Sequence, residues 1–323
     1  MRLRRRTGKV AELAPENMLR RLELKVVRRL EGLLHGDHLG LLPGPGSELA
    51  EARVYLPGED DVRHMDWAVT ARTTIPHVRD LVADRELETW ALVDLSASMD
   101  FGTARMEKRD LAVAALAAIG FLTARIGDRF GAYILEHGTT RRWPARSGRA
   151  ALYGLLHSLA NVPRTPAEAP DPILAGAVSS LSRSQPKRGL RVIVSDFLDL
   201  ELDPGAVRDW ERPMRQLATR HQVLAVEIVD PRELELPDVG LVTVVDPETG
   251  EAQDVYPTKR VRERYAAAAR AQREGTRRAL RRCGAQHLVL RTDRDWVDDI
   301  ARWVLQQRRV AHRLGRPVGG VSA

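Results

Sequence analysis

From residue 87 onward, apolar runs of strand length alternate with longer amphipathic segments, and this alternation is the feature that most constrains the fold. The strand-like runs are Leu87–Val93, Phe130–Leu135, Leu190–Val194, Val223–Val229 and His287–Leu290. The helix-like segments are Lys108–Ile126, Arg149–Leu159, Ile173–Leu181, Val207–His221, Arg260–Arg282 and Trp296–Arg309. Parallel strands that are buried on both faces read as near-continuous apolar runs, and each parallel connection needs a crossover helix. The pattern therefore predicts an α/β fold, a doubly wound and mostly parallel sheet with helices on both faces.

Segments outside this alternation suggest how the rest of the chain is organised. Residues 15–34 carry leucine and valine at helical spacing, which predicts an amphipathic helix. Residues 241–256 place a Pro-Glu-Thr-Gly turn between two β-rich runs, which predicts a late β-hairpin. We therefore expect an N-terminal helical and irregular arm over residues 1–86 that packs on the core, an α/β domain over residues 87–312, and a disordered tail over residues 313–323.

Composition narrows the classes of protein that this chain can represent. Of its 323 residues, 43% are hydrophobic, which is enough for a large core. The sequence contains no run of about 18 apolar residues, and its charged N-terminus lacks the apolar stretch of a signal peptide. The single cysteine, Cys283, excludes an intramolecular disulfide and a cysteine-rich zinc site. We therefore expect a soluble, cytoplasmic protein without a membrane span.

The net charge of +7 is unevenly distributed along the chain. Residues 1–35 hold 10 basic against 4 acidic residues, and residues 257–323 hold 17 against 6, so the middle of the chain is acidic. Basic ends of this kind can bind nucleic acid or an anionic membrane surface. However, these basic residues show no regular interleaving with aromatic residues, and the sequence has no zinc-finger or helix-turn-helix signature. Solvated faces of arginine-rich helices explain the same charges, so nucleic-acid binding stays an alternative.

Side-chain oxygens at alternate positions follow the first strong strand. The run Thr89–Asp100 reads TWALVDLSASMD and places Asp94, Ser96 and Ser98 directly after its apolar residues, while Asp196 follows another apolar run. Ligands of doubly wound sheets bind outside the carboxyl ends of the strands, so we expect these side chains at one edge. An all-oxygen set suits Mg²⁺ or Mn²⁺, and a carboxylate of another protein could complete the coordination.

Other interpretations of the same residues stay open. The Asp and Ser side chains could cap a loop by bonding their own backbone. A metal-dependent hydrolase or phosphotransferase could use the same carboxylates, although a phosphoaspartate enzyme would want a second carboxylate in place of Ser96. The Gly-x-Ser-x-Gly elbow of serine hydrolases and the His-Glu-x-x-His motif are absent from the sequence. We therefore expect a non-enzymatic binding site.

A polar block at residues 57–86 precedes the first strand of the alternation. Its charged members near the start are Glu59, Asp60, Asp61, Arg63, Asp66 and Arg72, and they follow a turn at Pro57-Gly58. The last three can form charge-assisted hydrogen bonds, and Trp67 can bury a large apolar face. The block is either a structural staple that pins the arm onto the sheet or a partner surface next to the metal edge.

Several of these motifs together resemble a known bacterial family. The sequence DLSASM at 94–99, together with SDF at 195–197, resembles the metal-ion-dependent adhesion site of von Willebrand factor type A domains. The longer block at 55–102, from YLPGEDDVRHMDW to DLSASMDFG, resembles the hallmark block of the domain-of-unknown-function 58 family. Later blocks that resemble this family are GDRFG at 127–131, LAVEIVDPRELELPDVG at 224–240 and VVDPETGE at 244–251.

The resemblance implies a von Willebrand factor A-like sheet and a metal edge at Asp94, Ser96, Ser98 and Asp196. It also implies a protein-binding role as an adaptor or co-chaperone, with a MoxR-type AAA+ ATPase as the partner, because members are often encoded beside such ATPases. The adhesion site normally adds a threonine from a further loop. Here Pro172-Ile173 stands in that place, and Asp171 is the candidate substitute.

Overall fold

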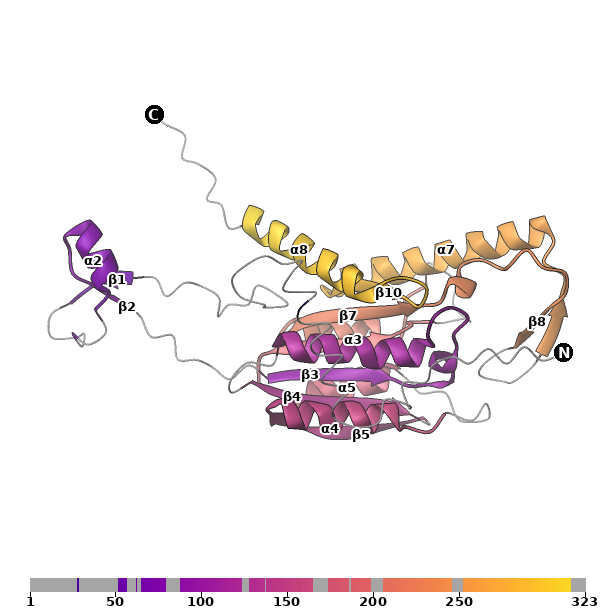
Figure 1. Cartoon of the computed structure of the whole chain (residues 1–323), viewed down its shortest axis with the longest axis horizontal. Coiled ribbons are helices and arrows are strands. Elements are labelled where there is room, and N and C mark those ends of the chain that lie inside the picture. Colours follow the sequence, from indigo (N-terminus) through magenta and orange to yellow (C-terminus); the bar gives the residue numbers. More distant parts are fainter. Residues whose placement is uncertain are drawn as a thin grey trace, which may run out of the picture. The chain divides into compact units, whose positions relative to one another are not determined.

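The computed structural model describes residues 28, 52–56, 62, 65–79, 88–123, 128–136, 138–164, 174–185, 187–198, 206–245 and 252–314 (Figure 1). These residues fall into two compact units. The first unit contains residues 88–303, and the second contains residues 52–79 and 304–314. Nearly all of the helix predicted at 15–34 and most of the predicted tail lie outside the described residues.

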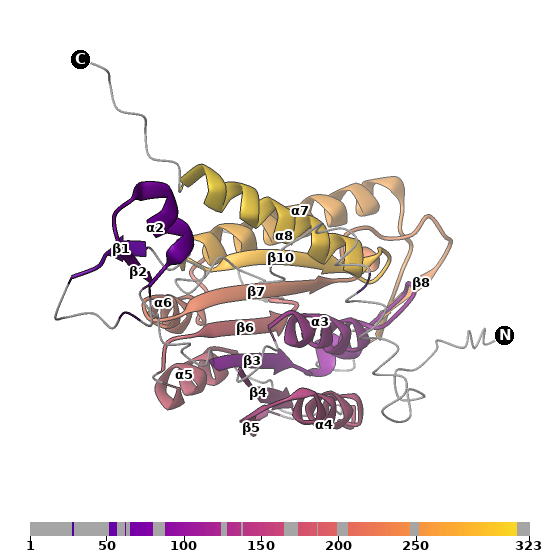
Figure 2. The same ribbon diagram turned by 60° about the vertical axis from the view of Figure 1, so that its left-hand side comes forward.

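A six-stranded sheet forms the centre of the first unit, with the strand order β10-β7-β6-β3-β4-β5 (Figure 2). Its strands are β3 (Glu88–Asp94), β4 (Arg129–Glu136), β5 (Thr139–Ser147), β6 (Leu190–Ser195), β7 (Gln222–Val229) and β10 (Gln286–Arg291). All neighbouring strands pair in parallel except β4 and β5, which are antiparallel. Because the order runs outward in both directions from the β3–β6 pair, the sheet is doubly wound. The predicted fold class is therefore confirmed.

Helices cover both faces of this sheet. On one face lie α3 (Lys108–Thr123) and α4 (Arg149–Ala160); on the other lie α5 (Leu174–Ser184), α6 (Glu211–Ala218) and α7 (Lys259–Arg282) (Figure 2). The last helix, α8 (Trp296–Leu314), follows β10, and its Trp303 indole N–H donates to the His287 carbonyl at 2.9 Å. Among the helices in the described residues, none combines the length and the apolar character that crossing a membrane requires.

Within the described residues, the predicted strands, helices and hairpin are present, with shifts of a few residues at their ends. All five strand-like runs form strands, and the predicted hairpin forms as β8 (Val242–Val245) paired with β9 (Ala252–Val255). The strand β5 is not among the predictions, because it lies at the sheet edge and most of its residues are exposed. An exposed edge strand can be rich in arginine, so it lacks the apolar run by which buried strands are recognised.

The described part of the second unit holds a short antiparallel pair, the helix α2 and the C-terminal end of α8. The strands β1 (Ala52–Val54) and β2 (His77–Arg79) pair with each other, and α2 spans Trp67–Thr73. Asp66 precedes the helix and accepts a hydrogen bond from the Val69 backbone N–H at 3.1 Å, as an N-cap residue does. Trp67 is 70% exposed, so the large apolar face that it can bury is mostly open. Residues 57–61 and Arg63 lie outside the described part of the chain.

Close packing at the centre of the sheet involves a glycine and a tryptophan. Trp90 on β3 is 1% exposed, and its ring centroid lies 5.5 Å from that of Tyr133. Gly131 on β4 pairs with Trp90 in register, and a Cβ atom at residue 131 would lie 2.7 Å from Cζ3 of the Trp90 ring. Neither the rigid indole nor the two paired strands can move away at low cost, so only glycine fits at this position.

We expect Gly131→Ala to lower the free energy of unfolding by about 1–3 kcal/mol, because the added methyl group overpacks the core against Trp90. The matched control is Gly154→Ala on the exposed side of α4, where the nearest atom, on Trp143, lies 3.8 Å from the added Cβ. That change should raise stability by up to ~1 kcal/mol through helix propensity. Urea unfolding measures both variants, and equal effects of the two changes would contradict the packing argument.

Candidate functional site

The structure brings four of the predicted metal ligands together at the carboxyl ends of β3 and β6. Asp94 is the last residue of β3, Asp196 directly follows β6, and these two strands are parallel neighbours. Ser96 and Ser98 enter through the 3₁₀ turn that follows β3, with their hydroxyl oxygens 3.2 Å apart. The Ser98 hydroxyl also bonds the Asp196 carboxylate. The site therefore lies where the strand order reverses, the usual ligand position of this architecture.

Hydrogen bonds from the adjoining loops and from the neighbouring strand β6 fix the two aspartate carboxylates. The Ser96 backbone N–H donates to Oδ1 of Asp94 at 3.0 Å, and the Ser195 hydroxyl donates to its Oδ2 at 2.7 Å. The Leu198 backbone N–H donates to Oδ1 of Asp196 at 3.1 Å. Phe197 lies between these donors with a φ of +51°, a left-handed conformation that costs a bulky residue energy. This tight turn is what aims the Asp196 side chain at the end of β3.

The two aspartates are buried, but their charges are balanced differently. Burial raises the pKa of Asp94 to about 6, and the nearby Asp196 carboxylate adds to this effect. Burial would also raise the pKa of Asp196, but the Lys108 ammonium outweighs burial and holds that pKa below its usual value. Among the residues that the structure describes, no Lys, Arg or His side chain forms an ion pair with Asp94. One carboxylate of the pair therefore has a cationic partner and the other relies on neutral donors.

Lys108, the first residue of α3, is a fully buried cation that sequence reasoning missed. Its Nζ lies 2.7 Å from Oδ2 of Asp196 and also bonds the Glu233 carboxylate. A positive charge is unfavourable at a helix N-terminus because the helix dipole is positive there. A lysine at the first position of α3, ahead of its long apolar run, is therefore the sequence signal that points to nearby carboxylates.

Beyond Lys108, the ion network continues across the sheet edge to α7 and β10. Arg273 of α7 donates to Glu233 at 3.0 Å, to Glu227 at 2.7 Å and to the backbone carbonyl of Asp196 at 2.9 Å. The far side of Glu227 contacts Nε2 of His287 at 2.8 Å. Charged side chains of α3, α7, β7 and β10 therefore form one connected network that includes Asp196. Each charged side chain in the network contacts at least one of opposite charge.

The motif Asp230-Pro-Arg-Glu233, within the block at 224–240, explains how the surrounding loops are held. The Asp230 carboxylate accepts from the Thr103 backbone at 2.9 Å and from the Thr292 hydroxyl at 2.7 Å. It also caps its own turn, where Glu233 reaches back to the Asp230 backbone N–H at 3.0 Å. Asp230 therefore ties the loop after β3 to the ends of β7 and β10, while Glu233 faces Lys108.

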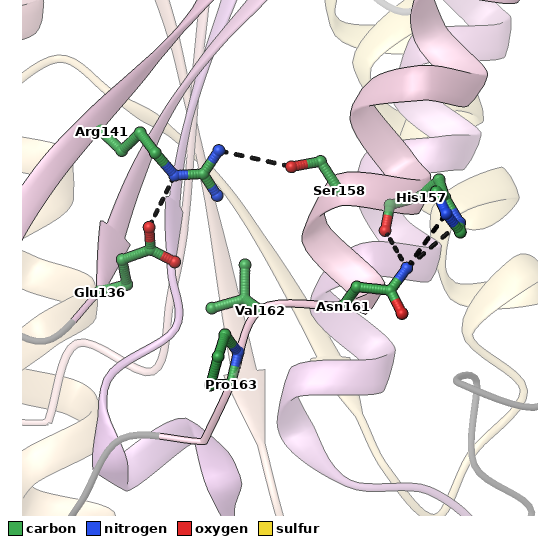
Figure 3. Close-up of a pocket in the computed structure, with 7 residues that line it drawn as sticks. All are labelled: Glu136, Arg141, His157, Ser158, Asn161, Val162 and Pro163. Atoms are coloured by element: carbon green, nitrogen blue, oxygen red, sulfur yellow. Dashed lines mark hydrogen bonds and ion pairs between the residues drawn. The ribbon is translucent and has the colours of Figure 1, made fainter.

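A pocket of about 440 Å³ opens at the end of β4, between β5 and α4 (Figure 3). It is lined by Glu136, Arg141, His157, Ser158, Asn161, Val162 and Pro163. Arg141 pairs with Glu136 at 2.7 Å on one wall and reaches Ser158 on the other, so its guanidinium is already engaged (Figure 3). Sequence reasoning did not find this pocket, because its walls come from segments without a recognisable motif.

The donor set at the strand ends suits a hard cation. Two carboxylates and two hydroxyls are oxygen ligands, which Mg²⁺ and Mn²⁺ accept together with water. Within the described ranges, no group of three or more His, Cys, Asp or Glu side chains is arranged to hold a metal ion. A cation at this edge would therefore need the Ser96 and Ser98 hydroxyls and water, in addition to the two carboxylates, to complete its coordination. Asp171 and Pro172 lie outside the described residues, so the expected substitute for the missing threonine stays a prediction.

The raised pKa of Asp94 predicts a pH dependence of stability. Because the folded-state pKa of about 6 exceeds the ordinary value of 3.8, ionisation of Asp94 destabilises the fold. The stabilising contribution is complete below pH ~4 and is lost as the pH rises through about 6, a change of about 3 kcal/mol. Asp94→Asn cannot ionise, so its stability relative to the wild type should rise by up to that amount. Urea unfolding in chelator at several pH values tests this, and parallel profiles for the two proteins would contradict it.

Comparison with known proteins identifies the family. The family described as "Protein of unknown function DUF58" matches residues 51–275. An uncharacterized protein of Mycobacterium tuberculosis is 54% identical over 293 residues, covering 91% of this chain and 90% of its own length. An uncharacterized protein of Mycobacterium avium is 45% identical over 170 residues, covering 53% of this chain and 96% of its own length.

Solved structures with a similar fold are more distant in sequence. BatB from Bacteroides thetaiotaomicron is 14% identical with a TM-score of 0.41, covering 69% of this chain and 99% of its own. The SpRpn10 VWA domain is 11% identical with a TM-score of 0.36, covering 74% of this chain and 100% of its own. The fold itself rests on the strand order and the antiparallel edge strand described above. The chain belongs to the DUF58 family, and its first unit has a von Willebrand factor type A-like fold.

Proposed function

We propose that the edge formed by Asp94, Ser96, Ser98 and Asp196 is a protein-docking site that uses a divalent cation. The observation that carries this proposal is the convergence of two buried carboxylates and two hydroxyls at the ends of adjacent parallel strands. The two serines would hold the cation through their hydroxyls, and Asp94 would bind it directly or through water. Asp196 would act through water, and Asp171 would supply the oxygen of the missing threonine. A bound Mg²⁺ or Mn²⁺ supplies a coordination position for a carboxylate oxygen of the partner.

A binding role is favoured over the enzymatic alternative by how the hydroxyls are engaged. The Ser195 hydroxyl donates to Asp94 and accepts from the Phe197 backbone N–H, and Ser98 bonds Asp196, so these serines serve as donors to carboxylates. In hydrolases of the triad type, a histidine beside the serine removes the proton of the hydroxyl. In the described part of the site, no histidine contacts Ser96, Ser98 or Ser195.

The proposal extends to the binding partner and to the cellular compartment. The family resemblance supports a MoxR-type AAA+ ATPase as the partner, with this chain as an adaptor that offers the metal edge to a Glu or Asp of that ATPase. The single cysteine, Cys283, is buried and free, as is usual for a protein of the reducing cytoplasm. Cytoplasmic location remains part of the proposal.

We expect millimolar Mg²⁺ or Mn²⁺ to raise the thermal stability of the wild type. A ligand at about 100 times its Kd stabilises the fold by about 2.7 kcal/mol. Asp94→Asn and Ser98→Ala should lose this gain, because the first removes the negative charge of the carboxylate and the second removes a hydroxyl ligand. Asp209→Asn is the matched control, since it neutralises an exposed carboxylate outside the site and should keep the full metal response. Thermal melts with and without metal measure the effect, and an equal response in all four proteins would remove the metal from the proposal.

Binding to the ATPase tests the docking role itself. We expect the MoxR-type AAA+ ATPase of the same organism to bind the wild type and Asp209→Asn equally, and to bind Asp94→Asn at least tenfold more weakly. Variants are more informative than a chelator here, because an ATPase itself requires Mg²⁺ with its nucleotide. Surface plasmon resonance measures the three affinities. Equal binding of all three proteins would show that the partner uses another surface.

A further inference from the structure

The Lys108 ammonium lies where it must interact with any cation bound at the strand ends. It contacts Oδ2 of Asp196 at 2.7 Å, and the same carboxylate is bonded by Ser98, a predicted cation ligand. Lys108 is fully buried, so no solvent separates it from these groups. Two positive charges that share one buried carboxylate weaken each other's binding, since each reduces the negative potential that attracts the other.

A second carboxylate gives the ammonium an alternative partner. Glu233 also bonds the Lys108 ammonium, and Arg273 and the Asp230 backbone N–H hold Glu233 in place. Lys108 can therefore give up Asp196 and stay paired inside the protein. Without Glu233, leaving Asp196 would strand a buried charge, which costs several kcal/mol.

The charge balance of the cluster leaves room for such an exchange. Among the described residues, the connected carboxylates Asp94, Asp196, Glu227 and Glu233 outnumber the permanent cations, Lys108 and Arg273. A buried cluster with excess negative charge is stabilised by a further cation. The excess lies toward Asp94, which forms no ion pair with a described residue.

We propose that Lys108 is a built-in competitor of the divalent cation: the two share Asp196, and Glu233 holds Lys108 when the cation binds. This inference rests on the proposed metal-dependent docking and adds a residue that sets the affinity of the site. The competition makes cation binding weak in the isolated chain. A partner carboxylate that completes the coordination shifts the balance toward the cation, so cation and partner bind together.

Two substitutions move the Mn²⁺ affinity in opposite directions. Lys108→Met removes the competing charge while keeping a long apolar side chain, and Mn²⁺ should then bind at least tenfold more tightly than in the wild type. Glu233→Gln removes the alternative partner and leaves Lys108 on Asp196, so Mn²⁺ should bind more weakly, by threefold or more. Lys259→Met removes an exposed charge at the start of α7 and is the matched control, with an expected affinity equal to that of the wild type.

Isothermal titration calorimetry with Mn²⁺ alone, on the full chain, measures the four affinities, and circular dichroism checks that each variant is folded. A merely structural role of Lys108 and Glu233 would weaken binding in both variants. If Lys108→Met does not fold, Glu233→Gln still decides, because unchanged or tighter binding in that variant overturns the competition.

The outcomes separate this inference from the proposed function. If the wild type and Lys108→Met bind Mn²⁺ equally, the competition is overturned and metal-dependent docking stays intact. Binding by Lys108→Met alone would support the inference, because it would show that Lys108 keeps the cation out of the isolated chain. The ATPase affinities of the wild type and Asp94→Asn then decide whether docking uses the cation. Binding by neither protein would overturn both.

Discussion

The buried contact between Lys108 and the Asp196 and Glu233 carboxylates is the interaction on which the candidate site depends. It joins the first residue of α3 to the end of β6 and to the turn after β7. Removing one partner of a buried ion pair typically costs about 3–5 kcal/mol, because the other charge is left without compensation. Arg273 then extends the contact to α7. The elements around the site are therefore held by charge as well as by apolar packing.

The parallel sheet explains why these charges can lie so close together. Each parallel strand delivers its last side chains to the same edge, and the reversal of strand order at β3 and β6 separates the connecting loops there. The apolar runs within β3, β6 and β7 bury the strands, so the polar residues that follow them meet over a core that excludes water. Burial strengthens every charge interaction at this edge, both the attraction of Lys108 to Asp196 and the repulsion between Asp94 and Asp196.

The sequence predicts the parts of this arrangement that local patterns determine. Apolar runs locate the buried strands, helical spacing locates the helices, and the position of Asp94 and Asp196 after two runs places them at one edge. It does not predict which distant charges pair, because Lys108 and Glu233 are 125 residues apart and meet only through the sheet topology. The edge strand β5 and the exposure of Trp67 are missed for a related reason, since neither depends on a local periodic pattern.

The asymmetry between the two aspartates gives the site its chemical character. If both had a cationic side chain as a partner, the edge would be a closed structural cluster with no affinity for a further cation. If neither had one, two buried carboxylates would repel each other and one would stay protonated near neutral pH. Here Asp196 is neutralised by Lys108, while Asp94 is held by the Ser195 hydroxyl and the Ser96 backbone N–H. The two carboxylates can therefore be buried together without a metal. Asp94 still keeps a buried negative charge at the edge where a partner would bind.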